Sequence, residues 1–163
     1  MIRPITPDDT TDLMAIAEAI GFQPNELEVL AEILTDYFKG NKNSDRFWLM
    51  DDDHGPVGVA YCEQERMTEG TWNLQFIAIQ PDRQGQGRGT ALLRYVEQTL
   101  VRRGARILLV ETSASLDRAR AFYRQCGYEE EARIRDFYGA GDDKIVCSKA
   151  LGGRGGSNPL KAD

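Results

Sequence analysis

The stretch Trp72–Leu93, WNLQFIAIQPDRQGQGRGTALL, decides the fold of this chain. It opens with an apolar run over residues 74–79, which stops at Pro81, and it closes in a helical pattern. Between the two, a glycine stands at every second position from Gly85 to Gly89. Such a turn points backbone N–H groups outward at the positive end of a helix dipole, where a phosphate would bind. Glycine is needed because a Cβ would obstruct the phosphate or forbid positive φ angles. The stretch therefore predicts a strand, an anion-binding turn and a helix.

The spacing of the glycines limits which phosphate ligand this turn would bind. A P-loop is excluded, because no Gly-Lys-Ser or Gly-Lys-Thr closes the turn. A dinucleotide fingerprint needs a third small residue, and the two reading frames put Thr90 or Leu92 there. Glu111 lies at about the distance expected of a ribose-binding acid, so a dinucleotide site stays open as an alternative. Its late position argues against it, because that fingerprint normally follows the first strand of its domain.

Composition limits the class of protein. The chain has 163 residues, of which 41% are hydrophobic and 28% charged, as expected of one globular domain. It has no run of eighteen apolar residues and no signal-peptide pattern, so we expect no membrane partner. The three scattered cysteines suit a reducing, cytoplasmic compartment.

Charge and metal-ligand content narrow the partners further. One histidine and no clustered cysteines predict that no metal is bound. A formal net charge of −6 argues against nucleic acid as a partner, because phosphate neutralisation needs a basic face. The same charge fits a cationic amine substrate.

Hydrophobic periodicity and turn residues predict alternating helices and strands on both sides of the central stretch. An opening strand at residues 2–5 precedes two helices, which end near Gly21 and Phe38. Strands follow at 46–50 and 56–64, joined by an acidic turn at 51–55. After the glycine turn come, in order, a helix to about 103, a strand at 106–111, a helix capped by 113–117, and a closing strand pair at 128–138 and 144–149.

Two motifs resemble signatures of the GNAT family of N-acetyltransferases. The pattern Gln84-x-x-Gly87-x-Gly89 is similar to its acyl-CoA-binding motif. Downstream, residues 119–128, ARAFYRQCGY, look like its second signature, a helix ending in Tyr-x-x-x-Gly-Phe/Tyr. The two motifs stand in the family's order, and the resemblance covers about residues 2–150.

The resemblance implies an α/β fold with a mixed central sheet of about seven strands and about four helices, splayed between strands 4 and 5. It implies one N-acetyltransferase domain over residues 1–150, followed by a tail at 151–163 that we predict to be disordered. The donor implied is acetyl-CoA, with no metal. Its pantetheine arm would pair with the backbone of Ile77, Ala78 and Ile79. Its pyrophosphate would bind the amides of the turn, namely Gly85, Gln86, Gly87, Arg88, Gly89 and Thr90, with Arg83 or Arg88 adding a side-chain contact. Gln84, the first residue of the motif, is also expected to belong to the donor site.

The resemblance also implies the residues that move protons. Glu111 is the candidate general base for the acceptor amine, with Glu63 or a water chain as alternatives, and it also fits a carboxylate that only salt-bridges the strand end. Tyr123 matches the tyrosine that protonates the departing CoA thiolate, or else it is a core aromatic. Where many relatives carry an Asn seven residues before that tyrosine, this chain has Leu116, so Ser113 or Ser115 is expected to take over the pantetheine contact.

These features together predict an acetyl-CoA-dependent N-acetyltransferase that works by direct attack in a ternary complex. The acceptor would be a small-molecule or peptide amine, and the resemblance allows a homodimer. A catalytically silent acyl-CoA sensor is the first alternative, and a dinucleotide-binding domain is the second.

Overall fold

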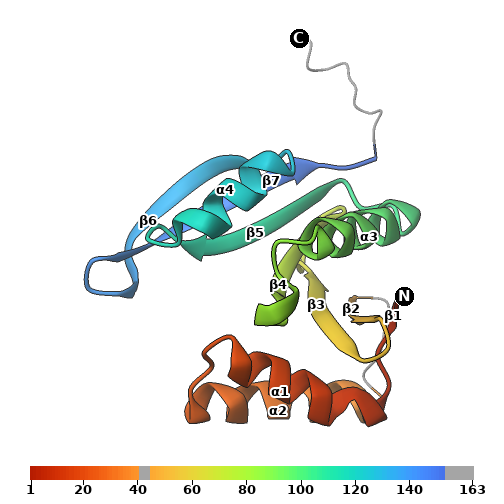
Figure 1. The fold of residues 1–163 in the computed structure, drawn as a ribbon. Helices are drawn as coiled ribbons and strands as arrows, with labels where there is room; N and C mark the ends of the chain where they lie inside the picture. The colour runs from red at the N-terminus through yellow and green to blue at the C-terminus, as the bar shows by residue number, and fades with distance from the viewer. Residues whose placement is uncertain (41–44, 153–163) are drawn as a thin grey trace. The chain divides into compact units, whose positions relative to one another are not determined.

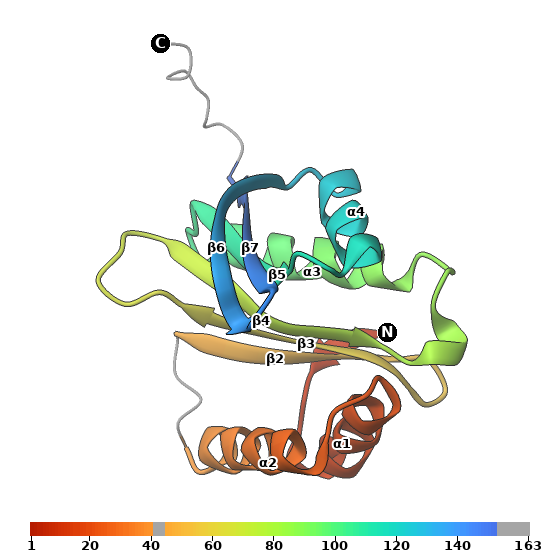
Figure 2. The same ribbon diagram turned by 90° about the vertical axis from the view of Figure 1, so that its left-hand side faces the viewer.

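The structure is a computed structural model that describes residues 1–40 and 45–152. Most of the predicted tail, residues 153–163, therefore lies outside the described residues. The described chain forms a seven-stranded sheet in the order β1-β2-β3-β4-β5-β7-β6, together with four α-helices (Figures 1 and 2). The sheet is mixed, because β4 and β5 are parallel whereas the other described pairs are antiparallel. The predicted α/β fold is thereby confirmed.

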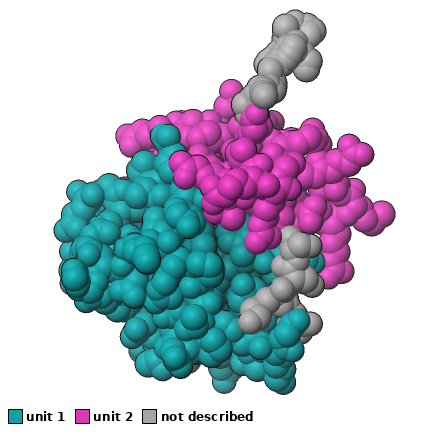
Figure 3. All heavy atoms as spheres, turned by 90° about the vertical axis from the view of Figure 1, so that its right-hand side faces the viewer, with its two compact units in different colours: residues 1–63, 76–96 teal, residues 64–75, 97–163 magenta. Residues whose placement is uncertain are grey.

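The chain divides into two compact units, coloured separately in Figure 3. Unit 1 comprises residues 1–63 and 76–96, and unit 2 comprises residues 64–75 and 97–163. Three elements contribute to both units, and the first of them, β3 (Pro56–Gln64), changes unit after Glu63. Strand β4 (Thr71–Ile79) changes unit after Gln75, and helix α3 (Arg88–Arg102) changes unit after Val96.

Unit 1 packs two helices on a meander of short strands. Its strands β1 (Ile2–Pro4), β2 (Arg46–Asp52) and β3 (Pro56–Gln64) pair antiparallel in chain order. Helices α1 (Thr10–Ala19) and α2 (Pro24–Phe38) lie side by side (Figure 2). Both bury apolar stripes at helical spacing, so the core of this unit consists mainly of Leu13, Ile16, Ala17, Leu30, Leu34 and Tyr37 against Trp48, Met50, Val59 and Tyr61.

Local signals fix where the helices of unit 1 begin and end. Pro24 occupies the first turn of α2, where its missing N–H costs nothing. The N–H of Gln23 donates to the Glu26 carboxylate at 2.7 Å, which supplies an acceptor at the helix start. Gly21 follows α1 with a φ of +111°, a conformation that other residues rarely adopt.

Unit 2 contains the parallel strand pair. Residues 71–74 of β4 pair with 107–110 of β5 (Ile107–Ser113), consistent with a sheet that splays beyond this point. Strand β7 (Asp142–Ala150) runs antiparallel to β5, and β6 (Glu129–Gly139) runs antiparallel to β7. Every residue of β6 is exposed, and helix α4 (Asp117–Gln125) lies near its start (Figure 1).

The second signature, residues 119–128, ends beside the buried carboxylate of Glu97. Gly127 ends α4 with a φ of +96°, as the pattern predicts, and the next residue, Tyr128, is buried. The hydroxyl of Tyr128 donates to Glu97 at 2.7 Å, and the Lys149 ammonium lies 3.1 Å from the same carboxylate. Glu97 is thus buried with both a hydrogen-bond donor and a cation, which a buried carboxylate requires.

Helix α4 begins within the predicted cap segment, residues 113–117. The cap position is Leu116, whose side chain makes no capping hydrogen bond. The serine hydroxyls are engaged elsewhere, since that of Ser113 donates to Asp142 and lies 2.8 Å from that of Ser115. Strand β5 also continues to Ser113, two residues beyond its predicted end, because Ser113 pairs with Lys144 of β7.

Candidate active site

The predicted strand, glycine turn and helix are present, and the end of the strand, the turn and the start of the helix lie in unit 1. Strand β4 ends at Ile79, a single 3-10 turn spans Pro81–Arg83, and α3 begins at Arg88. Gly85 and Gly87 have φ values of +77° and +80°, and no heavy atom lies within 4 Å of a Cβ placed on either. Glycine is therefore required here by the backbone conformation and not by crowding. The turn is solvent-exposed at the N-terminus of a 15-residue helix, so its unpaired N–H groups are open to an anion.

Gln84 ties this turn to the end of the strand. Its side-chain amide donates to the Ile79 carbonyl at 3.1 Å, which fixes where the chain leaves β4. On the β3 side, a Cβ at Gly58 would lie 2.5 Å from the Ile79 side chain and 2.9 Å from the Ala78 carbonyl. The end of β4, including half-buried Ile77, is therefore held closely against β3 within this unit. Pantetheine pairing by this backbone stays a prediction.

The two arginines of the turn are paired with the acidic hairpin between β2 and β3. Arg88 lies 3.3 Å from the Asp51 carboxylate and also donates to Asp53, and Arg83 lies 3.2 Å from Asp53. The pKa of Asp53 is lowered below its ordinary value, mainly by the hydrogen bond from Arg88 and further by that from Arg83. In this structure both cations are thus bound by carboxylates, so an anion at the turn would bind mainly to backbone N–H groups.

Sequence reasoning missed these ion pairs. The acidic turn at 51–55 was interpreted only as a hairpin, although its charge complements the two arginines of the glycine turn. His54, at the tip of the same hairpin, has a side chain that is 98% exposed and a φ of +58°, as expected of a turn residue.

In unit 2, Glu111 is held by two side chains that the sequence analysis did not name. Its Oε1 lies 2.8 Å from the ammonium of Lys144, and its Oε2 accepts a hydrogen bond from the Asn73 amide at 3.1 Å. Asn73 is buried and also donates to Glu65 at 3.1 Å. The Lys144 ammonium also lies 3.9 Å from the centre of the Phe137 ring. Glu111 therefore makes the salt bridge expected of a carboxylate with only a structural role, although its side chain is still 33% exposed.

Tyr123 is buried on α4 with its ring edge-on to two aromatic neighbours. Its ring centre lies 5.2 Å from that of Phe122 and 5.9 Å from that of Tyr128. Within residues 1–40 and 45–152, no hydrogen bond engages its hydroxyl. Burial raises the pKa of Tyr123 above its ordinary value, so the hydroxyl stays protonated at neutral pH. A protonated, unengaged hydroxyl has the properties of a proton donor.

The remaining predicted residues differ in how far they are engaged. Ser115 is exposed in the turn between β5 and α4, and its hydroxyl contacts Ser113. Glu63, the alternative base, accepts a hydrogen bond from the Tyr61 hydroxyl in unit 1. The Glu63 carboxylate is therefore already engaged by the buried Tyr61 hydroxyl. The pKa of Tyr61 is raised, mainly by burial and further by its hydrogen bond to Glu63.

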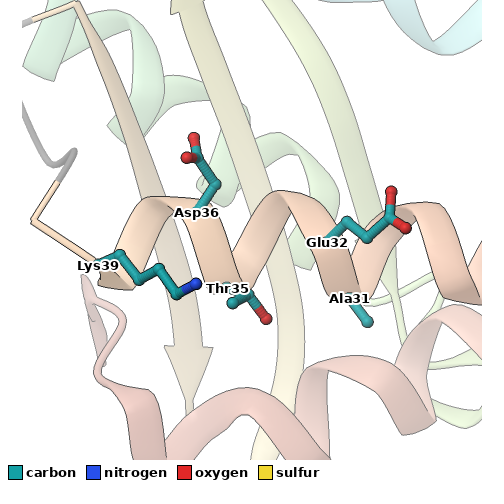
Figure 4. A pocket seen from close by; sticks show the side chains of 5 residues that line it. All are labelled: Ala31, Glu32, Thr35, Asp36 and Lys39. Atoms are coloured by element: carbon teal, nitrogen blue, oxygen red, sulfur yellow. The ribbon is translucent and has the colours of Figure 1, made fainter.

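Three other features lie apart from these residues. A surface pocket of about 300 Å³ on α2 is lined by Ala31, Glu32, Thr35, Asp36 and Lys39, none of them a predicted site residue (Figure 4). Among the described residues, no group of three or more His, Cys, Asp or Glu side chains is placed to hold a metal ion. No helix in the described part of the chain is long and apolar enough to cross a membrane.

Over residues 11–128, the chain matches the model of the acetyltransferase (GNAT) family. The chain belongs to this family. Its match with the ribosomal protein bS18-alanine N-acetyltransferase of Escherichia coli K12 is 38% identical over 91 residues. That match covers 56% of this chain and 60% of the relative, so the chain spans less than two thirds of the curated relatives it matches.

Solved structures agree with the GNAT fold. A Desulfovibrio desulfuricans protein of the GNAT family superposes with a TM-score of 0.86 at 32% identity, over 92% of this chain and 98% of that one. The Escherichia coli S18-alanine enzyme gives a TM-score of 0.75 at 23% identity, over 98% and 97% of the chains. An aminoglycoside 6′-N-acetyltransferase in complex with coenzyme A gives 0.77 at 16% identity, over 98% and 99%. The last two likenesses concern the fold alone.

Proposed function

We propose that the protein is an acetyl-CoA-dependent N-acetyltransferase that acts on an amine acceptor by direct attack in a ternary complex. The observation that carries the proposal is the glycine turn, in which positive φ angles at Gly85 and Gly87 leave the N-terminus of α3 open to an anion. Membership of the GNAT family supports the reaction class.

The donor would bind to residues of unit 1. Its pyrophosphate takes the backbone N–H groups of residues 85–90, and its pantetheine arm takes backbone groups of residues 77–79. The complex of the aminoglycoside 6′-N-acetyltransferase with coenzyme A supports this choice of donor over a dinucleotide. Ser115 of unit 2 would add a hydroxyl contact to the arm.

The proton transfers would be made by residues of unit 2. An alkylammonium with a pKa of about 10 is neutral in roughly one molecule in a thousand at pH 7, so a base must take its proton. Glu111 takes that proton, and the free amine attacks the thioester carbonyl carbon. As the C–N bond forms, the C–S bond breaks, and Tyr123 gives its proton to the departing thiolate. The products are an acetylated amine and CoA.

The acceptor class is a primary amine on a small molecule or a peptide. A relative named for ribosomal-protein alanine and a structural neighbour named for an aminoglycoside support these two kinds of acceptor. We further expect a cytoplasmic location, in line with three free, buried cysteines. A homodimer stays a prediction.

One observation favours a second candidate function, a catalytically silent acyl-CoA sensor. Both carboxylate oxygens of Glu111 are already engaged, by Lys144 and by Asn73. A base that stayed so occupied would take no proton, and the glycine turn would then bind the donor without turnover.

Calorimetric titration of acetyl-CoA, CoA and NAD into the wild type and a Gly87→Glu variant tests the donor site. The substitution puts an anion at the proposed pyrophosphate site, so micromolar acetyl-CoA binding should be lost. Gly21→Glu is the matched control, because Gly21 also has a positive φ and open space around it, in the same unit. Equal acetyl-CoA binding in Gly87→Glu would refute the donor site, and preferential binding of NAD would indicate the dinucleotide alternative.

Turnover then separates enzyme from sensor. A panel of primary amines is incubated with acetyl-CoA, and CoA release is recorded. Release above background supports the enzyme, whereas acetyl-CoA binding without release from any amine supports the sensor.

A further inference from the structure

The ammonium of Lys144 occupies a site built for an alkylammonium group. It lies 2.8 Å from the Glu111 carboxylate and 3.9 Å from the centre of the Phe137 ring. A carboxylate and the face of an aromatic ring are the two partners that stabilise an organic cation in proteins. The Lys144 side chain is 11% exposed, so these partners take the place of most of the water around its ammonium.

The partners themselves face solvent more than the lysine does. The Glu111 side chain is 33% exposed, and Phe137 is 51% exposed on β6. The opposite oxygen of Glu111 is fixed by Asn73, which Glu65 holds in turn. The carboxylate is therefore oriented even without Lys144, and an external ammonium can approach both it and the ring.

We propose that Lys144 is an internal competitor for the acceptor, because its ammonium fills the place between Glu111 and Phe137 that a primary ammonium acceptor takes. The inference rests on the proposed function, in which Glu111 accepts the proton of the acceptor. It names the acceptor class as an unbranched primary ammonium, since a lysine side chain is itself such a group.

Competition has a defined effect on affinity. When a binding site is free for only a fraction of the time, the apparent dissociation constant equals the intrinsic one divided by that fraction. If Lys144 fills the site about nine-tenths of the time, removing its charge should strengthen acceptor binding about tenfold.

The test uses n-butylamine as the probe and 1-butanol as its uncharged counterpart, titrated by calorimetry into the full chain at pH 7.5. Lys144→Met removes the charge and is one atom shorter than lysine, so the place of the ammonium is vacated while the rest of the side chain stays apolar. We expect the Kd of n-butylamine to fall about tenfold in this variant, with no change for 1-butanol. Lys144→Arg, which keeps a cation at the site, should bind n-butylamine no more tightly than the wild type. Lys39→Met, which removes the same charge just after the end of α2, should behave as the wild type.

Kinetics provide a second readout wherever n-butylamine is acetylated. The KM for n-butylamine should fall in Lys144→Met while the KM for acetyl-CoA stays constant. A fall in kcat without a fall in the amine KM or Kd would overturn the proposal and make Lys144 a positioning residue for Glu111. Absence of n-butylamine binding from every variant would overturn it as well.

One further variant tests the aromatic partner of the ammonium site. Phe137→Leu removes only an exposed ring and should weaken n-butylamine binding several-fold in the Lys144→Met background. If Lys144→Met unfolds, Phe137→Leu is made in the wild-type chain instead, where it should likewise weaken n-butylamine binding. The amine titration needs no acetyl-CoA, so it tests the ammonium site even if the protein has no transferase activity. Absence of transferase activity would refute the proposed function alone.

Discussion

Arg88 lies 3.3 Å from Asp51, a carboxylate whose side chain is only 3% exposed, and this pair joins segments 37 residues apart. The arginine stands between the two last glycines of the turn, where the sequence suggests a phosphate ligand. Because its guanidinium group is bound by the β2–β3 hairpin, the turn keeps its shape without a ligand and offers mainly backbone donors.

Removing the charge of Asp53 should release cationic groups next to the donor site. Asp53 accepts from both Arg88 and Arg83. We expect Asp53→Asn to bind acetyl-CoA about three- to tenfold more tightly at low salt, with a steeper loss of affinity as salt is added. Calorimetry at two ionic strengths measures this, with Asp8→Asn as the control for net charge. Unchanged affinity and salt dependence would mean that neither guanidinium reaches the donor.

Gly58 should be needed for the geometry of the end of β4. A Cβ there would lie 2.9 Å from the Ala78 carbonyl, a backbone atom that would have to move. We expect Gly58→Ala to lower the free energy of unfolding by about 1–3 kcal/mol and to weaken acetyl-CoA binding. Urea unfolding and calorimetry test both effects. Gly139→Ala, which meets no atom within 4 Å, should change neither, and equal effects in the two variants would argue against steric crowding.

The Arg3–Asp9 pair should make stability fall in acid. The hydrogen bonds from Arg3 lower the pKa of Asp9 below its ordinary value of 3.8. Asp9 therefore contributes its full stability above that value, and loses it as pH falls through the lower pKa of the folded state. We expect Asp9→Asn to cost about 1–3 kcal/mol at pH 7 and less as pH approaches 2. Urea unfolding across pH 2–7 measures this, and the exposed Asp12→Asn is the control. A cost independent of pH would contradict the electrostatic explanation.

Tyr123→Phe should separate chemistry from binding. The change removes one hydroxyl that makes no hydrogen bond among the described residues, so the fold should be unaffected. We expect kcat for amine acetylation to fall about 10²- to 10⁴-fold, with acetyl-CoA affinity unchanged. Because burial raises the pKa of Tyr123, wild-type activity should not decline through tyrosine ionisation between pH 7 and 9. Tyr37→Phe, in unit 1, is the control, and an unchanged kcat in Tyr123→Phe would make Tyr123 a core aromatic only.

The elements that the sequence predicted correctly depend on local chemistry. The glycine turn follows from the φ angles that only glycine adopts readily, and the ends of α1 and α4 follow from Gly21 and Gly127 in the same way. Helices α1 and α2 follow from apolar stripes at a period of 3.6 residues. Each of these signals is contained in a short stretch of neighbouring residues, so the sequence alone reveals it.

The partners of the site residues could not be predicted, because they come from distant segments. Asn73 lies 38 residues before Glu111 and was interpreted only as part of a strand, whereas its amide fixes that carboxylate. Lys144 was placed on a closing strand, but no pattern revealed that it would reach Glu111 across β5 and β7. The partner of Ser113 is distant for the same reason, since its hydroxyl donates to Asp142.

The chain passes between its two units three times, after residues 63, 75 and 96, and these passages fall inside β3, β4 and α3. No single cleavage therefore yields one whole unit free of pieces of the other. A fragment that ends at residue 96 carries the unit 2 part of β4 without its partner strand β5, and cuts α3 short. Deletion mapping would consequently yield misfolded fragments and would not separate the proposed donor-binding and proton-transfer residues. An engineered chimera must therefore replace both segments of a unit together.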